Sequence, residues 1–78
     1  MYIDRTDRSP FERWFAGLRD EAAQAAVLIR LRRLALGLAG DSRSVGAGVF
    51  ELRVHIGPGY RVYCAWEGPE QVVLLGGG

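Results

Sequence analysis

The stretch ELRVHIGPGYRVY, from Glu51 to Tyr63, decides the fold because it is typical of two strands joined by a tight turn. Alternate side chains of a strand point to opposite faces of a sheet. The apolar residues of both arms therefore fall on one face: Phe50, Leu52, Val54, Ile56, Tyr60, Val62, Cys64 and Trp66. The charged and polar residues fall on the other face.

The length of the loop sets whether the two apolar faces coincide. A three-residue loop of Gly57, Pro58 and Gly59 keeps the apolar side chains together. It pairs Ile56 with Tyr60, His55 with Arg61 and Arg53 with Tyr63. A two-residue loop would shift the register by one residue and mix the faces, which a half-buried sheet disfavours. We therefore expect the odd loop, with a glycine at positive φ. With this loop, the polar side chains of the two strands form one patch of Glu51, Arg53, His55, Arg61 and Tyr63.

Length and composition predict one small globular domain over residues 1–78, since the chain is 49% hydrophobic and 24% charged. The net charge of +1 gives no overall basic field that would attract nucleic acid. All of the basic residues are arginines, which keep their proton at any working pH and bind phosphate or carboxylate with two nitrogens. They can stabilise an anion, but a general base must come from another residue type.

The single cysteine, Cys64, excludes an intramolecular disulfide and a multi-cysteine metal site. It falls on the apolar face, so we interpret it as a core residue and not as a nucleophile. Charged residues precede any apolar run, which argues against a signal peptide. The most apolar stretch, 22–29, is far shorter than the ~20 residues that span a bilayer. We expect a cytoplasmic protein with no membrane partner.

Two helices are predicted before the hairpin. Ser9 is expected to cap the first, with Pro10 at its first position and Glu12 at the capping-box spacing. Asp20 is expected to cap the second, which runs from Glu21 to Leu38 and ends in glycines. The apolar stripe of the second helix is Ala23, Val27, Leu31, Leu34 and Leu38.

The remaining segments complete the predicted sheet. Residues 41–48 are interpreted as a polar connection, 71–75 as an apolar central strand and 1–3 as a short edge strand. We therefore expect an α+β fold, with two N-terminal helices packed on one face of a small antiparallel sheet whose main part is a three-stranded meander.

The motifs occur in a specific order: FxxWxxxLxD at 11–20, an Arg-Leu helix ending in Gly, GD at 40–41, VGxGVxELR at 45–53 and GPGYRVY at 57–63. This order resembles the RelE/ParE toxin superfamily and, more narrowly, is similar to the HigB-like addiction module killer proteins. The resemblance covers nearly the whole chain. Members similar to this chain continue with a GGDK-type segment and a C-terminal helix, so we expect this domain to be C-terminally truncated and to hold half of a site.

The resemblance implies the toxin of a type II toxin-antitoxin system, neutralised by a helix-turn-helix antitoxin protein. Members resembling RelE or HigB cut mRNA on the ribosome with no metal or other cofactor. Arg61 matches the arginine of the GYR motif and is the best candidate for phosphate stabilisation, with Arg53 second. Tyr63 or His55 could stack on a base or shuttle a proton, and Glu51 could act as a base where related enzymes carry basic residues.

Other interpretations stay open for the same residues. Glu51, Arg53 and Arg61 could form a solvated cross-strand charge pair without chemistry. Arg30 and Arg33 could contact RNA or the antitoxin, or could simply belong to a solvated helix face. The whole chain could be a non-catalytic binding module, either a ParE-like gyrase inhibitor or an inactive antitoxin-binding remnant. The helices and an exposed sheet edge are candidate antitoxin surfaces.

Overall fold

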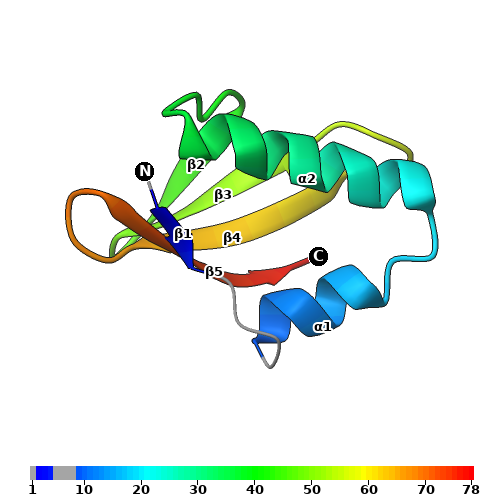
Figure 1. Ribbon diagram of the computed structural model, residues 1–78, viewed down its shortest axis with the longest axis horizontal. Coiled ribbons are helices and arrows are strands. Elements are labelled where there is room, and N and C mark those ends of the chain that lie inside the picture. The colour runs from blue at the N-terminus through cyan, green and yellow to red at the C-terminus, as the bar shows by residue number, and fades with distance from the viewer. Residues whose placement is uncertain (1, 5–8) are drawn as a thin grey trace.

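A computed structural model of the chain, which describes residues 2–4 and 9–78, has an α+β fold (Figure 1). The elements in chain order are β1 (Tyr2–Asp4), α1 (Pro10–Ala16), α2 (Glu21–Ala35), β2 (Ser42–Gly46), β3 (Val49–Val54), β4 (Tyr60–Trp66) and β5 (Gln71–Gly77). Figure 1 shows α2 crossing one face of the sheet and α1 lying beside the end of β5. The predicted α+β class is confirmed, although the sheet is not wholly antiparallel as predicted, because β1 runs parallel to β5.

Both helices begin where the sequence predicts. The hydroxyl of Ser9 accepts a hydrogen bond from the backbone N–H of Glu12 at 3.1 Å. The carboxylate of Asp20 accepts one from the N–H of Ala22 at 2.9 Å. Each contact satisfies a backbone donor that the first turn of a helix leaves without a partner.

The second helix ends at Ala35, so its predicted extension to Leu38 is wrong. Gly37 adopts a φ of 82° and its N–H donates to the carbonyl of Leu34 at 2.9 Å, while the N–H of Leu38 donates to that of Arg33 at 2.8 Å. This pair of bonds is the Schellman motif, which a glycine at positive φ permits. Leu38 therefore lies outside the helix and is 60% exposed. The other residues of the predicted stripe are buried.

The sheet is larger than the predicted three-stranded meander. Its strand order is β1-β5-β4-β3-β2, with β1 parallel to β5 and the other neighbours antiparallel. The segment predicted as a polar connection, 41–48, contains β2, which pairs with β3 at the edge of the sheet. All residues of β2 are exposed, so no apolar alternation marks it as a strand in the sequence. The predicted edge strand at 1–3 and central strand at 71–75 correspond to β1, in its described residues, and β5.

The hairpin has the predicted faces but a different register. The loop comprises residues 55–59, because Val54 pairs with Tyr60 and Leu52 with Val62. The N–H of Gly59 donates to the carbonyl of Ile56 at 2.9 Å, and this turn removes Ile56 from the ladder. The predicted pairing of Ile56 with Tyr60 is therefore wrong by two residues. A shift of two preserves which face each side chain occupies.

The core lies between the helices and one face of the sheet. Its buried residues are Phe11, Val27, Leu31, Leu34, Leu52, Val54, Val62, Cys64, Val72 and Leu74. Cys64 is fully buried, and burial raises the pKa of its thiol to about 12. This environment confirms its interpretation as a core residue, because the reactive thiolate is scarcely populated at neutral pH. Among the described residues, no helix is long and apolar enough to cross a membrane.

Trp14 fixes α1 against the end of β5. A Cβ atom added to Gly77 would overlap the indole ring of Trp14, so the ring lies directly on the glycine backbone. The same indole meets the ring of Tyr60 edge-on, with centroids 6.4 Å apart. Because Tyr60 begins β4, this contact joins α1 to the loop end of the hairpin.

Replacement of Gly77 by Ala should reduce the free energy of unfolding by about 1 to 3 kcal/mol, because the added methyl group must displace the indole. Gly76→Ala is the matched control, since nothing lies within 4 Å of its added Cβ. Chemical denaturation of both variants measures the difference. Equal midpoints for the two variants would contradict this packing of Trp14.

Candidate functional site

A pocket of about 440 Å³ opens at the loop end of the hairpin. We call it the arginine pocket, and its lining residues are Arg53, Val54, His55, Pro58, Gly59, Tyr60, Arg61, Tyr63 and Gly78. The pocket therefore brings together four of the five residues of the predicted polar patch, while Glu51 lies outside its lining.

Arg53 and Arg61 are direct cross-strand partners in the antiparallel pair of β3 and β4. Side chains in such positions start from Cβ atoms about 5 Å apart, and like charges there are destabilising. The register differs from the prediction, which paired Arg53 with Tyr63 and Arg61 with His55. Among the residues that the structure describes, no carboxylate forms an ion pair with Arg61. Two neighbouring guanidinium groups, one of them without such a partner, favour the binding of an anion.

The backbone of Arg61 is held in place by the end of β5. Its N–H donates to the carbonyl of Gly78 at 2.8 Å, and the N–H of Gly78 donates back to the carbonyl of Arg61 at 2.9 Å. Gly78 also lines the arginine pocket. Both backbone polar groups of Arg61 are therefore hydrogen-bonded to Gly78, while the residue itself is exposed.

Glu51 differs from its predicted position at the surface of the patch, because it is only 6% exposed. It lies between Arg43 of β2 and Tyr63 of β4, its two cross-strand neighbours. Glu51 therefore has a strand on each side, and one of them, β2, was not predicted from the sequence. The Nε of Arg53 donates to Oε1 of Glu51 at 3.3 Å, and the two terminal nitrogens of Arg53 are not part of this ion pair. Glu51 therefore orients Arg53 and neutralises part of its charge.

His55 lies just beyond the end of β3 and its side chain is 73% exposed. Its Nε2 contacts Oδ2 of Asp41. Hydrogen bonding to His55 lowers the pKa of the Asp41 carboxyl below its ordinary value, and the charges of His55, Arg53 and Arg30 act in the same direction. Sequence reasoning placed Asp41 in a connection and missed it as a site residue, although the GD motif contains it.

Two tyrosines complete the wall of the arginine pocket. Tyr63 is half-buried on the same face as Arg61, as predicted. Tyr60 was assigned to the apolar face, and its place in the pocket was not predicted. The signal that could have found it is its position at the first residue of a strand, directly after the loop. Both rings offer flat surfaces for stacking.

The predicted RNA contacts on α2 are separate from the arginine pocket. Arg30 is half-buried, and its Nη2 donates to the backbone carbonyl of Asp41 at 2.8 Å. Arg30 therefore holds the loop that contains Asp41, and it does not line the arginine pocket. Arg33 is exposed in the last turn of α2 and does not line the pocket either.

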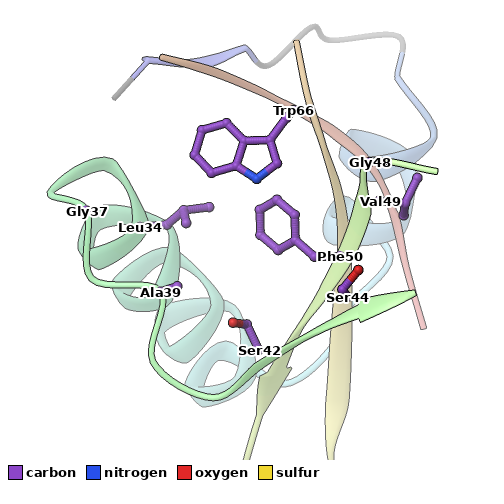
Figure 2. A pocket seen from close by; sticks show the side chains of 9 residues that line it. All are labelled: Leu34, Gly37, Ala39, Ser42, Ser44, Gly48, Val49, Phe50 and Trp66. Atoms are coloured by element: carbon purple, nitrogen blue, oxygen red, sulfur yellow. The ribbon is translucent and has the colours of Figure 1, made fainter. Parts of the chain in front are cut away.

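A second pocket of about 440 Å³ lies between the end of α2 and the sheet (Figure 2). We call it the aromatic pocket, and it is lined by Leu34, Gly37, Ala39, Ser42, Ser44, Gly48, Val49, Phe50 and Trp66. Figure 2 shows Leu34 pointing toward the rings of Phe50 and Trp66, whose centroids are 5.9 Å apart. Trp66 was predicted to pack under the helices, but it is 46% exposed at this rim. The lining carries no charged side chain.

The fold and its pockets define a small α+β domain in which two helices pack against a five-stranded sheet with an arginine-lined pocket at one hairpin. The chain is 43% identical over 68 residues to an uncharacterized protein of Haemophilus influenzae, and the alignment covers 87% of this chain and 69% of that protein. The chain therefore belongs to the same family as the Haemophilus influenzae protein. No family model matches the sequence, and no solved structure matches it.

Replacement of Arg61 by Gln should stabilise the free protein by roughly 0.2 to 1 kcal/mol at low salt, because it removes the like charge opposite Arg53. The gain should shrink at high salt, where the repulsion is screened. The same variant should bind inorganic phosphate more weakly, as measured by amide NMR shifts during a titration.

Arg19→Gln is the matched control, because Arg19 is exposed between the two helices and outside the arginine pocket. It should change neither quantity. Unaltered phosphate binding by the Arg61 variant would show that the two arginines do not form an anion site.

Proposed function

We propose that the chain is the toxin of a type II toxin-antitoxin system and acts as a ribosome-dependent mRNA endonuclease. The observation that carries the proposal is the cross-strand pair of Arg53 and Arg61, which lines one pocket together with a histidine and two tyrosines. A phosphodiester and its neighbouring bases offer the anion and the flat rings that such a pocket can bind. The motifs shared with RelE/ParE-like and HigB-like toxins support the same proposal, which places the protein in the cytoplasm.

The proposed reaction needs three functions at the scissile phosphate. Attack of the ribose 2′-oxygen on phosphorus forms a cyclic phosphate and breaks the bond to the 5′-oxygen. The 2′-OH loses a proton, the 5′-oxygen gains one, and the phosphorane between them carries extra negative charge. Arg61 and Arg53 are placed to stabilise that charge, and His55 can exchange a proton. Tyr63 supplies a ring for base stacking.

Glu51 has a different role in this proposal from that of a base. Its carboxylate is buried and engaged by Arg53, so a substrate hydroxyl cannot reach it without disrupting the ion pair. Glu51 then acts by holding the Arg53 guanidinium at the pocket.

Purified protein added to a translating extract should cut the message at specific codons, detected by primer extension. Arg61→Ala should reduce the cleavage rate by about 10² to 10³, the effect of removing one preorganised donor from a developing anion. Arg19→Ala should cleave like the unmodified chain, because its side chain is exposed outside the pocket. Intact RNA in the presence of the unmodified protein would refute the endonuclease proposal.

A non-catalytic binding module is the second candidate, and the aromatic pocket favours it. Large apolar side chains are exposed on and beside the segments that line this pocket: Leu36, Leu38, Val45 and Trp66. Exposed apolar clusters of this kind mark protein contacts. The same surface suits a helix-turn-helix antitoxin in the first proposal, or a gyrase-like target in the second. A DNA damage response without RNA cleavage would favour ParE-like action.

Trp66→Ala should weaken the complex with a helix-turn-helix antitoxin encoded beside this gene by about 30-fold, the effect of losing one aromatic hot spot. Isothermal titration of the purified proteins measures it. Leu28→Ala is the control, because Leu28 is 42% exposed on α2 but outside the aromatic pocket. If only the Leu28 variant binds weakly, the antitoxin contacts the exposed surface of α2 around Leu28 and not the aromatic pocket. RNA cleavage by the Trp66 variant should be unchanged.

A further inference from the structure

Three contacts fix Asp41, which lies between α2 and β2. Its backbone carbonyl accepts from Nη2 of Arg30 at 2.8 Å and from the N–H of Arg53 at 3.0 Å. Its carboxylate contacts Nε2 of His55. The main chain of Asp41 is thus held from α2 on one side and from β3 on the other, while the side chain is directed to His55.

Gly40 makes the approach of Arg30 possible. It adopts a φ of 64°, and a Cβ at this position would collide with the guanidinium of Arg30. The close fit means that the position of the Asp41 loop is set by α2. Arg30 and His55 contact different atoms of Asp41, so the hydrogen-bonded path from Arg30 to His55 runs through Asp41.

We infer that Asp41 is a positioning residue that orients His55 for proton transfer at the arginine pocket, and that Arg30 holds Asp41 in place. The inference rests on the proposed endonuclease function. His55 is highly exposed on a loop, and without such a contact its ring would have no fixed orientation. The contact with Asp41 supplies one.

The contact also determines which ring nitrogen is basic. An ionised carboxylate can only accept a hydrogen bond, so Nε2 of His55 carries a proton, and in the neutral form of the imidazole Nδ1 keeps its lone pair. In the proposed reaction Nδ1 takes the proton of the 2′-OH as the bond from the 2′-oxygen to phosphorus forms. The bond to the 5′-oxygen breaks and that oxygen takes a proton from water. The Asp41 carboxylate stabilises the imidazolium.

The charges around Asp41 keep its carboxylate ionised. The hydrogen bond to His55 is the largest cause of its lowered pKa, and the charges of His55, Arg53 and Arg30 add to it, opposed by a smaller effect of desolvation. A carboxyl whose pKa is lowered by folding stabilises the folded protein above its ordinary pKa, and that contribution is lost as the pH falls through the lowered value. Asp41 is therefore ionised at neutral pH and can accept the hydrogen bond from His55.

NMR can test the contact without any assay of activity, because His55 is the chain's single histidine. In His55→Gln, the pKa of Asp41 should rise toward its ordinary value. In Asp41→Asn, the ring-nitrogen shifts of His55 should move toward the other tautomer, since the amide NH₂ can donate to Nε2. Glu67→Gln, in an exposed turn, should change neither signal. Unchanged signals in both variants would overturn the inference.

Cleavage kinetics test the role of the contact. His55→Gln should lower the rate by about 10² to 10⁴, the range of general acid-base catalysis, and Asp41→Asn by about 10 to 100. The double variant should be no slower than His55→Gln alone, because Asp41 acts through His55. Additive losses would overturn the positioning role. RNA left intact by the unmodified protein would instead refute the proposed function, and the NMR shifts would still decide whether Asp41 orients His55.

Arg30→Gln separates positioning from RNA contact at this residue. A positioning role should lower kcat about tenfold with little change in KM. A phosphate contact should instead raise KM and reduce the salt dependence of RNA binding. The second result would contradict the place of Arg30 in this network and restore its interpretation as an RNA contact.

Discussion

Arg53 and Arg61 repel each other across β3 and β4, and the rest of the fold holds them together. The residues on the opposite face of the same strands, Leu52, Val54 and Val62, are buried against the helices and fix the strand register. Slippage by one residue would expose that apolar set to water. The hydrophobic core thus maintains an unfavourable pair of charges, as expected where stability is given up for a binding site. Glu51 reduces the repulsion by neutralising part of the charge of Arg53, while it forms no ion pair with Arg61.

The alternation of apolar and polar residues predicted which side chains share a face, but it did not predict their neighbours. Face membership follows from a period of two and survives any register shift by an even number of residues. The register depends on where the turn closes, and the sequence between Val54 and Tyr60 permits both a three-residue and a five-residue loop. The difference decides whether Arg53 faces Tyr63 or Arg61, and so whether two arginines are paired across the hairpin.

Two features of the site arise from contacts that are distant in sequence. β2 has no buried side chain, so neither apolar alternation nor composition marks it, and its pairing with β3 places Arg43 beside Glu51. Asp41 and His55 are 14 residues apart and meet only because β2 and β3 are antiparallel neighbours. The helix caps at Ser9 and Asp20 could be predicted because each depends on residues within one turn. The contacts that could be predicted join residues close in sequence, and those that were missed join residues far apart in sequence.

The two pockets occupy opposite ends of the same strand pair. The aromatic pocket includes Phe50 and Trp66, and the arginine pocket includes Val54 and Tyr60. The four residue steps from Phe50 to Val54 correspond to roughly 13 Å. A partner bound only at the aromatic pocket would therefore leave the arginine pocket open. If the chain is a toxin of the proposed kind, its antitoxin must extend along the sheet to cover Arg61. Otherwise it must be large enough to keep the toxin from entering the ribosome. Under the proposed function, partner binding and chemistry could therefore be altered separately, because the two pockets lie at different ends of one hairpin.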